Sequence, residues 1–500
     1  MKKYKYILSI VTTCIVLLLG TACEDILKED PISVVSDSKF WKTNEDADLG
    51  VAAIYDAMQK TYRVNRFYWG EYRADNYVVS DKPSGQTEDL LNNQLTPETE
   101  EYLRWNELYK MVFRANTAIE KIPQIPQYDP HLLGEAYACR AYAYFDAYRV
   151  WGGVPLFKDA ALIFDESSFK ARSTPEEVLA LVLSDIEEAT KLISRPTSPS
   201  RFSIASLLAF KAKVFMFLNR HQDANDALDD LIALKQYSLT TDRISWGNLF
   251  LNDVAFPNQG EEGPELIMSL KYDFAEDGRR ASGIYSLFFQ GVPSVWVSPK
   301  VDNLWKEKFP IDSISWTDKY PGVPPHVINT DPASGDEISV YGDYRYYETI
   351  TEVGSPQDLR VSKYAKTNYS PAEDDTDIVL FRYADMLLLK AEAENQLDNP
   401  QGAVDLVDEV RVARGLPKVN SGAFPDVDIN DKNALEDFIL EERQLELFAE
   451  GTRWWDLVRT NKAVEVMGPI NNQTEATIIW PIYFRHLVDN PKLEQNEAYR

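Results

Sequence analysis

Three glutamates at four-residue spacing, Glu442, Glu446 and Glu450, are the side chains of this sequence best suited to acid–base chemistry. A glycosidase places two carboxylates on opposite sides of the bond that it cleaves. If residues 432–459 form a helix, these glutamates would instead lie side by side on adjacent turns. The same segment carries three arginines: Arg443, Arg453 and Arg459. We therefore interpret it as a structural ion network, and a hydrolase acting through Glu446 or Glu450 is kept as an alternative.

The sequence lacks the common signatures of metal and cofactor chemistry. Its four histidines (His131, His221, His326 and His486) include no pair at H-x-x-x-H spacing, and there is no C-x-x-C. Zinc sites typically need such patterns. There is also no G-x-S-x-G, P-loop or G-x-G-x-x-G sequence. We expect a protein that is not an enzyme, with no catalytic residues, no metal and no cofactor.

Aromatic rings interleaved with polar side chains occur in two stretches and indicate sugar binding. A sugar ring offers an apolar C–H face to tryptophan or tyrosine, while its hydroxyls need polar partners. In RVNRFYWGEYRADNYVVSD (63–81) the candidate ligand-binding residues are Tyr68, Trp69, Arg73, Asn76 and Asp81. In IYSLFFQGVPSVW (284–296) they are Tyr285, Phe289 and Trp296. Poor periodicity in the second stretch predicts a loop that displays its rings. The alternative for every ring is a place in the core, which we expect for Trp151, Trp454 and Trp455.

Helical periodicity dominates the elements that would position these residues. Candidate helices are 45–62, 100–121, 131–150, 174–193, 203–219, 222–235, 378–396, 400–413 and 432–459. The clearest start is Thr174-Pro175-Glu176-Glu177, which offers an N-cap, a proline at the first helical position and a glutamate at the third. Residues 240–377 are irregular and rich in Pro, Gly, Asp, Tyr and Trp, with possible strands in 263–274 and 346–353. Such a section is often where binding residues lie.

A weak internal repeat predicts two similar helical hairpins. Residues 207–234 align without gaps on residues 386–413, so that Ala212 matches Ala391 and Ala224 matches Ala403. Small residues at a crossing let two helices approach closely, as in tetratricopeptide-like hairpins that stack on a shared face. Chance similarity between two amphipathic hairpins is the alternative.

The first residues carry the signals of export. Lysines at the start are followed by an apolar run from Ile7 to Leu19, which is short for a membrane span. Small residues then precede Cys23, as in the cleavage box of bacterial lipoproteins, and acids follow it at once. We expect a signal peptide over residues 1–22 and lipidation of Cys23. An ordinary signal peptide with a chance cysteine is the alternative.

The charge and the cysteines restrict the partners further. The formal charge is −27, and loss of the three lysines of the signal would make it −30. Such a surface disfavours nucleic acid, which is bound largely through phosphate contacts from Lys and Arg.

Of three cysteines, Cys14 would leave with the signal and Cys23 would carry lipid. Cys139 is then alone, and we expect it to be a small buried residue.

Six segments, taken in order, resemble the SusD/RagB family of outer-membrane lipoproteins. They are CEDILKEDP (23–31), RAYAYFDAYRVWGGVPLF (140–157), DYRYYETI (343–350), IVLFRYADMLLLKAEA (378–393), EERQLELFAEGTRWWDLVR (441–459) and WPIYFRHLVDNPKLEQNEAY (480–499). The final NEAY departs from the commoner NPGY, which we expect to alter a turn and not the fold. The resemblance covers nearly all of the chain after the signal.

The resemblance implies a mostly α fold, a superhelix of tetratricopeptide-like hairpins with an irregular, loop-rich, ligand-facing region. It implies a helical N-terminal part over 23–239, the ligand-facing part over 240–377 and a helical C-terminal part over 378–500. It also implies a lipid-anchored protein at the outer membrane, facing outward, that captures glycan and hands it to a SusC-like TonB-dependent β-barrel transporter. A lid of the same architecture that captures peptide or protein is the alternative, since helical grooves also take peptide segments.

Overall fold

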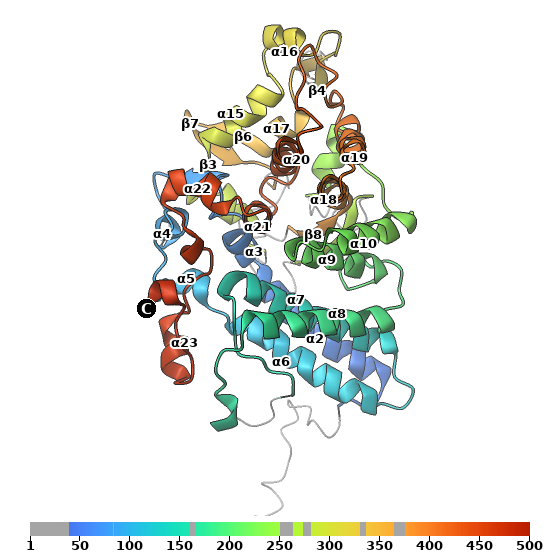
Figure 1. Ribbon diagram of the computed structural model, residues 1–500, viewed down its shortest axis with the longest axis vertical. Coiled ribbons are helices and arrows are strands. Elements are labelled where there is room, and N and C mark those ends of the chain that lie inside the picture. Colours follow the sequence, from blue (N-terminus) through green and yellow to red (C-terminus); the bar gives the residue numbers. More distant parts are fainter. Residues whose placement is uncertain are drawn as a thin grey trace, which may run out of the picture.

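The computed structural model describes residues 40–83, 85–160, 166–250, 264–273, 282–330, 337–364 and 376–500. The signal peptide and Cys23 lie outside these ranges. The chain is mostly helical, as expected, with four small two-stranded sheets (Figure 1). No helix among the described residues is long and apolar enough to cross a membrane.

Four long helices form the N-terminal layer. They are α2 (Asn44–Tyr62), α6 (Asn106–Lys121), α7 (Pro130–Trp151) and α8 (Pro175–Leu192), and Figure 1 shows them together in the lower half of the molecule. The predicted cap of α8 is confirmed, because Thr174 Oγ1 accepts from Glu177 N at 3.2 Å and Glu177 Oε2 accepts from Thr174 N at 2.9 Å. The predicted helix 100–121 is interrupted between α5 (Glu100–Leu103) and α6. Arg104 there is extended, which ends the first helix.

The two hairpins of the repeat are present and touch each other. One consists of α9 (Ile204–Phe217) and α10 (His221–Ala233), the other of α18 (Tyr383–Gln396) and α19 (Pro400–Ala413), and α10 packs on α18. Ala212, Ala224, Ala391 and Ala403 are all fully buried. Small side chains at these positions let the paired helices come close, as the alignment predicted. Cys139 lies in the same interior, and burial raises the pKa of its thiol.

The middle of the chain holds more regular structure than its composition predicted. Its elements are α11 (Arg243–Asn248), β2 (Leu266–Leu270), α14 (Ile284–Phe288), β3 (Val295–Val297), α15 (Pro299–Lys308), α16 (Ser313–Lys319), β4 (His326–Thr330), β5 (Glu337–Val340), α17 (Tyr344–Thr349), β6 (Ile350–Val353) and β7 (Ser355–Val361). The possible strand in 263–274 is confirmed as β2. The possible strand in 346–353 is only half right, because α17 occupies its first part.

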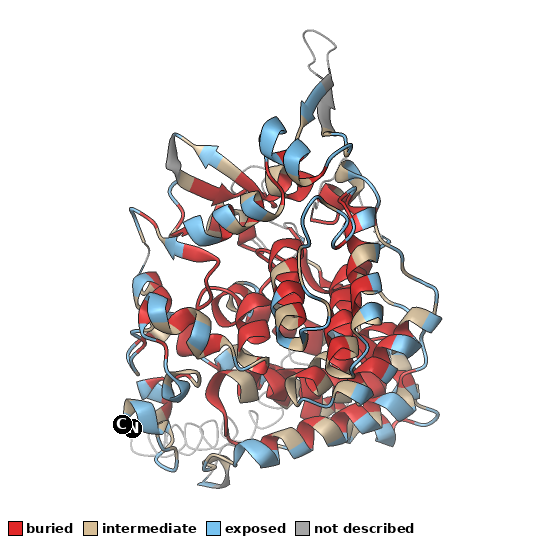
Figure 2. Ribbon diagram, turned by 45° about the horizontal axis from the view of Figure 1, so that its top comes forward, coloured by how far each residue is buried: buried red, intermediate tan, exposed pale blue. Residues whose placement is uncertain are grey.

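Two of the four antiparallel ladders tie this middle region to the rest. β1 (Tyr77–Val79) pairs with β3, and β2 pairs with β8 (Ile378–Arg382), so the middle joins both helical parts. β4 pairs with β5 and β6 with β7 as local hairpins. Figure 2 shows the buried residues concentrated in the helical interior. Exposed residues lie along the outer faces and at the projecting hairpin of β4 and β5.

The predicted helix over 432–459 is wrong in its second half. The observed helix α20 (Lys432–Glu446) ends early, and α21 (Arg453–Arg459) starts after a tight connection, followed by α22 (Ala463–Asn471). Ala449 and Gly451 in this connection have φ angles of 62° and 74°. A Cβ atom on Gly451 would lie 2.7 Å from the backbone oxygen of Arg66. The close approach of the segment around Arg66 therefore leaves no room for a side chain at residue 451.

Candidate functional site

The first aromatic stretch is built into the core and does not form the surface that we predicted. Trp69 is 2% exposed, and its indole N–H donates to the carbonyl oxygen of Tyr102 at 3.1 Å. Tyr68 is also buried, with its ring 4.5 Å from that of Tyr102. Both rings lie on or beside α3 (Asn65–Gly70), a short helix facing the interior. Their burial argues against direct contact with a ligand.

The polar residues of this stretch also have partners inside the protein. Arg73 donates to Asn93 Oδ1 at 2.6 Å and to Gln473 Oε1 at 2.7 Å, and its guanidinium lies 4.7 Å from the ring centre of Trp454. Asn76 is fully buried between Glu71 and Gln444. Of the five candidates in 63–81, Asp81 is the one that is exposed.

The second aromatic stretch keeps rings near the surface. Tyr285, the second residue of α14, and Phe289, which directly follows that helix, are half-buried, with ring centres 5.5 Å apart and planes inclined by 38°. Trp296 is 7% exposed and lies in β3, so the stretch is not simply the ring-displaying loop that we predicted. Trp151, Trp454 and Trp455 are buried as expected.

Arg360, a residue that the sequence did not single out, holds the second stretch in place. Its guanidinium carbon lies 5.2 Å from the ring centre of Trp296. It forms a two-point ion pair with Asp358, at 2.9 and 3.0 Å, and donates to the carbonyl oxygens of Phe289, at 3.1 Å, and Gly291. β7 thus fixes both the Trp296 ring and the turn that follows Phe289. Nothing local in the sequence links Arg360 to this stretch, because the carbonyl groups that it binds lie about 70 residues away.

The β1–β3 ladder brings the two predicted stretches together. Val78 lies opposite Trp296, and one end of the ladder is closed by a hydrogen bond from Ser80 N to Ser294 O at 3.1 Å. Asp81 follows Ser80 in the chain at this end of the ladder. At the other end Ser298 N donates to Asn76 O at 2.8 Å. The candidate surface therefore consists of Asp81, Tyr285, Phe289 and Trp296 with Arg360 behind the rings.

A polar groove of about 490 Å³ opens at the far end of the same ladder. It lies between α15, α20, α21 and α22, which Figure 1 shows close to β3. Asp75 is buried at this groove and binds Arg453 and Lys300, each at 2.9 Å. Burial alone would raise the pKa of Asp75, but Arg453 and Lys300 hold it far below its usual value. Asp75 and Arg453 lie far apart in the chain, so no local pattern predicts their pairing.

Four further acidic side chains line this groove. They are Glu307, Asp437, Glu441 and Glu465, and the further cation is Lys462. Lys462 pairs with Asp437 at 2.5 Å. The groove therefore disfavours a polyanionic ligand and suits neutral or cationic groups.

The three glutamates form the structural ion network that their spacing predicted. Glu446 is fully buried and accepts from Arg382 at 2.6 Å and Arg414 at 2.8 Å, and also from Arg345. Although burial alone would raise the pKa of Glu446, these guanidinium groups hold it well below the usual value. Glu450 binds Arg382 and Lys363, and Glu442 binds Arg411 and Lys308. Pairing with three guanidinium groups favours the ionised form of Glu446, which is a poor proton donor.

Metal binding has no support among the described ranges, where no group of three or more His, Cys, Asp or Glu side chains could hold a metal ion.

Comparisons with known proteins agree on one family. The model described as "SusD family" matches residues 332–499, and one described as "Starch-binding associating with outer membrane" matches residues 32–216. SusD-like protein P38 of Formosa agariphila is 62% identical over 505 residues, covering 100% of both chains. A SusD-like protein of Bacteroides ovatus is 23% identical, over 88% of this chain and 80% of that protein.

Solved structures share the fold at lower identity. A laminarin-binding SusD-like protein has a TM-score of 0.68 at 21% identity, covering 92% of this chain and 100% of the other. NanU of B. fragilis has a TM-score of 0.71 at 21% identity, covering 94% and 100%.

Proposed function

The chain belongs to the SusD family, and on that premise we propose that it is a cell-surface lipoprotein that binds glycan and delivers it to a SusC-like TonB-dependent transporter. The observation that carries the proposal is the full-length likeness to SusD-like protein P38 at 62% identity. The matching model for starch-binding proteins and the laminarin-binding structural relative point to sugar as the ligand class. The protein acts by binding and not by catalysis.

In this proposal the glycan contacts the exposed parts of the rings of Tyr285 and Phe289. Their rings are set side by side and held by Arg360 through the carbonyl oxygen of Phe289. A sugar ring stacks on such a surface through its C–H face, and the fixed backbone lowers the ordering cost of binding. Asp81, exposed just after the β1 strand that pairs with β3, supplies a carboxylate for hydroxyl groups. Trp296 contributes by supporting Arg360 and the turn.

In this proposal, lipid attached to Cys23 anchors the protein in the membrane. Acyl chains would supply the membrane affinity that an acidic body lacks. Cys23→Ser should move the protein from the membrane fraction to the soluble fraction, with glycan binding unchanged. A variant that stays in the membrane fraction contradicts the anchor but not the ligand. Changing Glu24 and Asp25 to alanine tests whether these acids direct the protein to the outer surface.

A binding screen tests the ligand class. The purified full-length chain in detergent is applied to a broad set of polysaccharides and oligosaccharides, and separately to protein digests. The proposal expects binding to at least one glycan and none to the digests. Binding to digests alone selects the peptide-capturing lid instead. Isolation of the protein from native membranes should bring a β-barrel transporter with it.

A further inference from the structure

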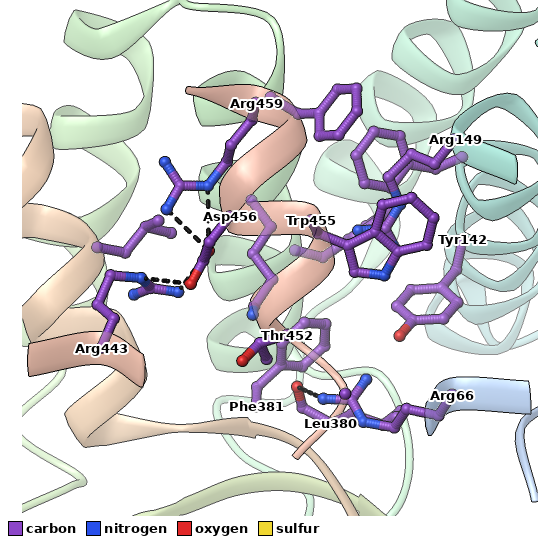
Figure 3. A pocket seen from close by; sticks show the side chains of 16 residues that line it. Arg66, Tyr142, Arg149, Leu380, Phe381, Arg443, Thr452, Trp455, Asp456 and Arg459 are labelled. Carbon is purple, nitrogen blue, oxygen red and sulfur yellow. Dashed lines mark hydrogen bonds and ion pairs between the residues drawn. The ribbon is translucent and has the colours of Figure 1, made fainter. Parts of the chain in front are cut away.

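A small cavity in the helical body brings five cationic side chains together. It lies between α7, α9, α18, α20 and α21, and its volume is about 40 Å³. The cations are Arg66, Arg149, Lys213, Arg443 and Arg459. Figure 3 shows Arg149 beside Trp455 on one side, with Arg443, Asp456 and Arg459 joined on the other. This cavity is separate from the candidate glycan surface.

The carboxylates around the cavity do not balance its cations. Arg149 pairs with Asp146, Lys213 with Asp385, Arg443 with Asp385 and Asp456, and Arg459 with Asp456 and Glu392. Within the described part of the chain, Arg66 pairs with no carboxylate, and its guanidinium donates to the carbonyl oxygen of Leu380 at 3.3 Å. Five cations thus share four carboxylates. Arg66 is partly buried, and an uncompensated charge that is partly withdrawn from water is costly, so this site favours an anion.

Two buried N–H groups of residues that line the cavity have no protein acceptor among the described residues. The Nε atoms of Arg66 and Arg149 are buried, and neither has a hydrogen-bond partner among the residues that the structure describes. Arg149 lies with its guanidinium carbon 4.2 Å from the ring centre of Trp455. Buried charged donors without acceptors are strongly unfavourable, and an anion would satisfy them.

The electrostatics of Lys213 point the same way. Burial lowers the pKa of its amine, Asp385 at 2.6 Å opposes this, and Arg443 and Arg66 lower it further. The positive potential of the neighbouring guanidinium groups is therefore felt inside the cavity.

We propose that this cavity binds a small monovalent anion of about the size of chloride. A water molecule needs roughly 10–15 Å³ of such space, so the cavity has room for a halide but not for a sugar. Water could satisfy the two Nε donors, but it could not balance the extra charge. The side chains of Arg149 and Lys213 are 12% and 20% exposed, which gives an ion a route to solvent. Anion binding would lock α7, α9 and α21 together.

Bromide tests the proposal, because it replaces chloride and can be located by anomalous diffraction. Crystals of the full chain soaked in sodium bromide should show a bromide peak inside the cavity. In solution, the thermal unfolding midpoint should rise saturably with sodium bromide when sodium gluconate keeps the ionic strength constant. This wild-type comparison needs no variant.

Arg66→Met supplies the matched test in solution, since Arg66 has no carboxylate to leave behind. The Arg66→Met variant should need at least tenfold more bromide than the wild type to reach half of the maximal rise in its thermal unfolding midpoint. Arg104→Met, at an exposed arginine paired with Glu100, should respond like the wild type. A cavity that holds only water, binding at crystal concentration only, or equal bromide dependence in both variants would overturn the proposal.

Discussion

Replacing Glu446 by glutamine should expose the charge balance of the buried network. Four cations and four carboxylates meet there: Arg345, Lys363, Arg382 and Arg414 with Glu265, Asp343, Glu446 and Glu450. Glutamine keeps the shape of the side chain and removes one negative charge. One buried positive charge is then left without compensation, and an amide N–H group faces guanidinium donors.

The expected loss of unfolding free energy is about 3–5 kcal/mol, the usual cost of removing one partner from a buried ion pair. Equilibrium unfolding of the full chain in urea, followed by tryptophan fluorescence, measures it. With a slope of about 3 kcal/mol per M, the midpoint should fall by about 1 M or more while the slope stays the same.

Glu441→Gln is the control on the same helix. Glu441 is 41% exposed and pairs with Lys308 at 3.0 Å, so its loss should cost less than about 1 kcal/mol. If Glu446→Gln costs no more than Glu441→Gln, the network does not depend on charge balance and the reasoning is refuted.

Three further predictions concern stability. Burial would raise the pKa of Glu442, but Arg411 lowers it from 4.5 to about 2. The ionised Glu442 should therefore stabilise the fold by about 3 kcal/mol above pH 4.5, and this stabilisation should be lost as the pH falls towards 2. In Glu442→Gln the free energy of unfolding, measured in urea at several pH values, should fall less between pH 4.5 and 2 than in the wild type. Thr174→Ala removes the N-cap of α8 and should cost about 1 kcal/mol in thermal unfolding; a change near zero would mean that the cap is redundant. Gly451→Ala should cost more than Gly354→Ala, by about 1–3 kcal/mol, because both have positive φ but only Gly451 has a backbone oxygen within 2.7 Å of the new Cβ. Equal costs would show that the close approach is unimportant.

Features encoded over a few residues could be predicted from the sequence. The capping box at Thr174 and Glu177 is one, since both partners lie within one helical turn. The repeat was visible because alanines at helix crossings leave a spacing pattern. The ion pairing of Glu442 and Glu446 could be predicted, because adjacent turns of α20 place them side by side, whereas Glu450 joins the network from the connection after α20.

Features that depend on distant contacts could not be predicted. Trp69 and Arg73 have the composition of a sugar site, yet Tyr102 and Gln473 take their hydrogen bonds inside the core. The close approach of Arg66 to Gly451 joins segments that are far apart in the chain, so it could not be predicted. The candidate surface itself needs Arg360, which reaches the second stretch only through the fold.

The most direct test of glycan binding is isothermal titration of the full chain, with the glycan found by the screen, against matched ring variants. Phe289→Ala and Tyr285→Ala should each weaken binding by about tenfold, which corresponds to about 1.4 kcal/mol per stacked ring. Phe424→Ala removes a ring that is 70% exposed on the loop between α19 and α20, and should leave the affinity unchanged. Equal affinity in all three variants would contradict the assignment of this surface. If the wild type binds no glycan at all, the proposed function is wrong.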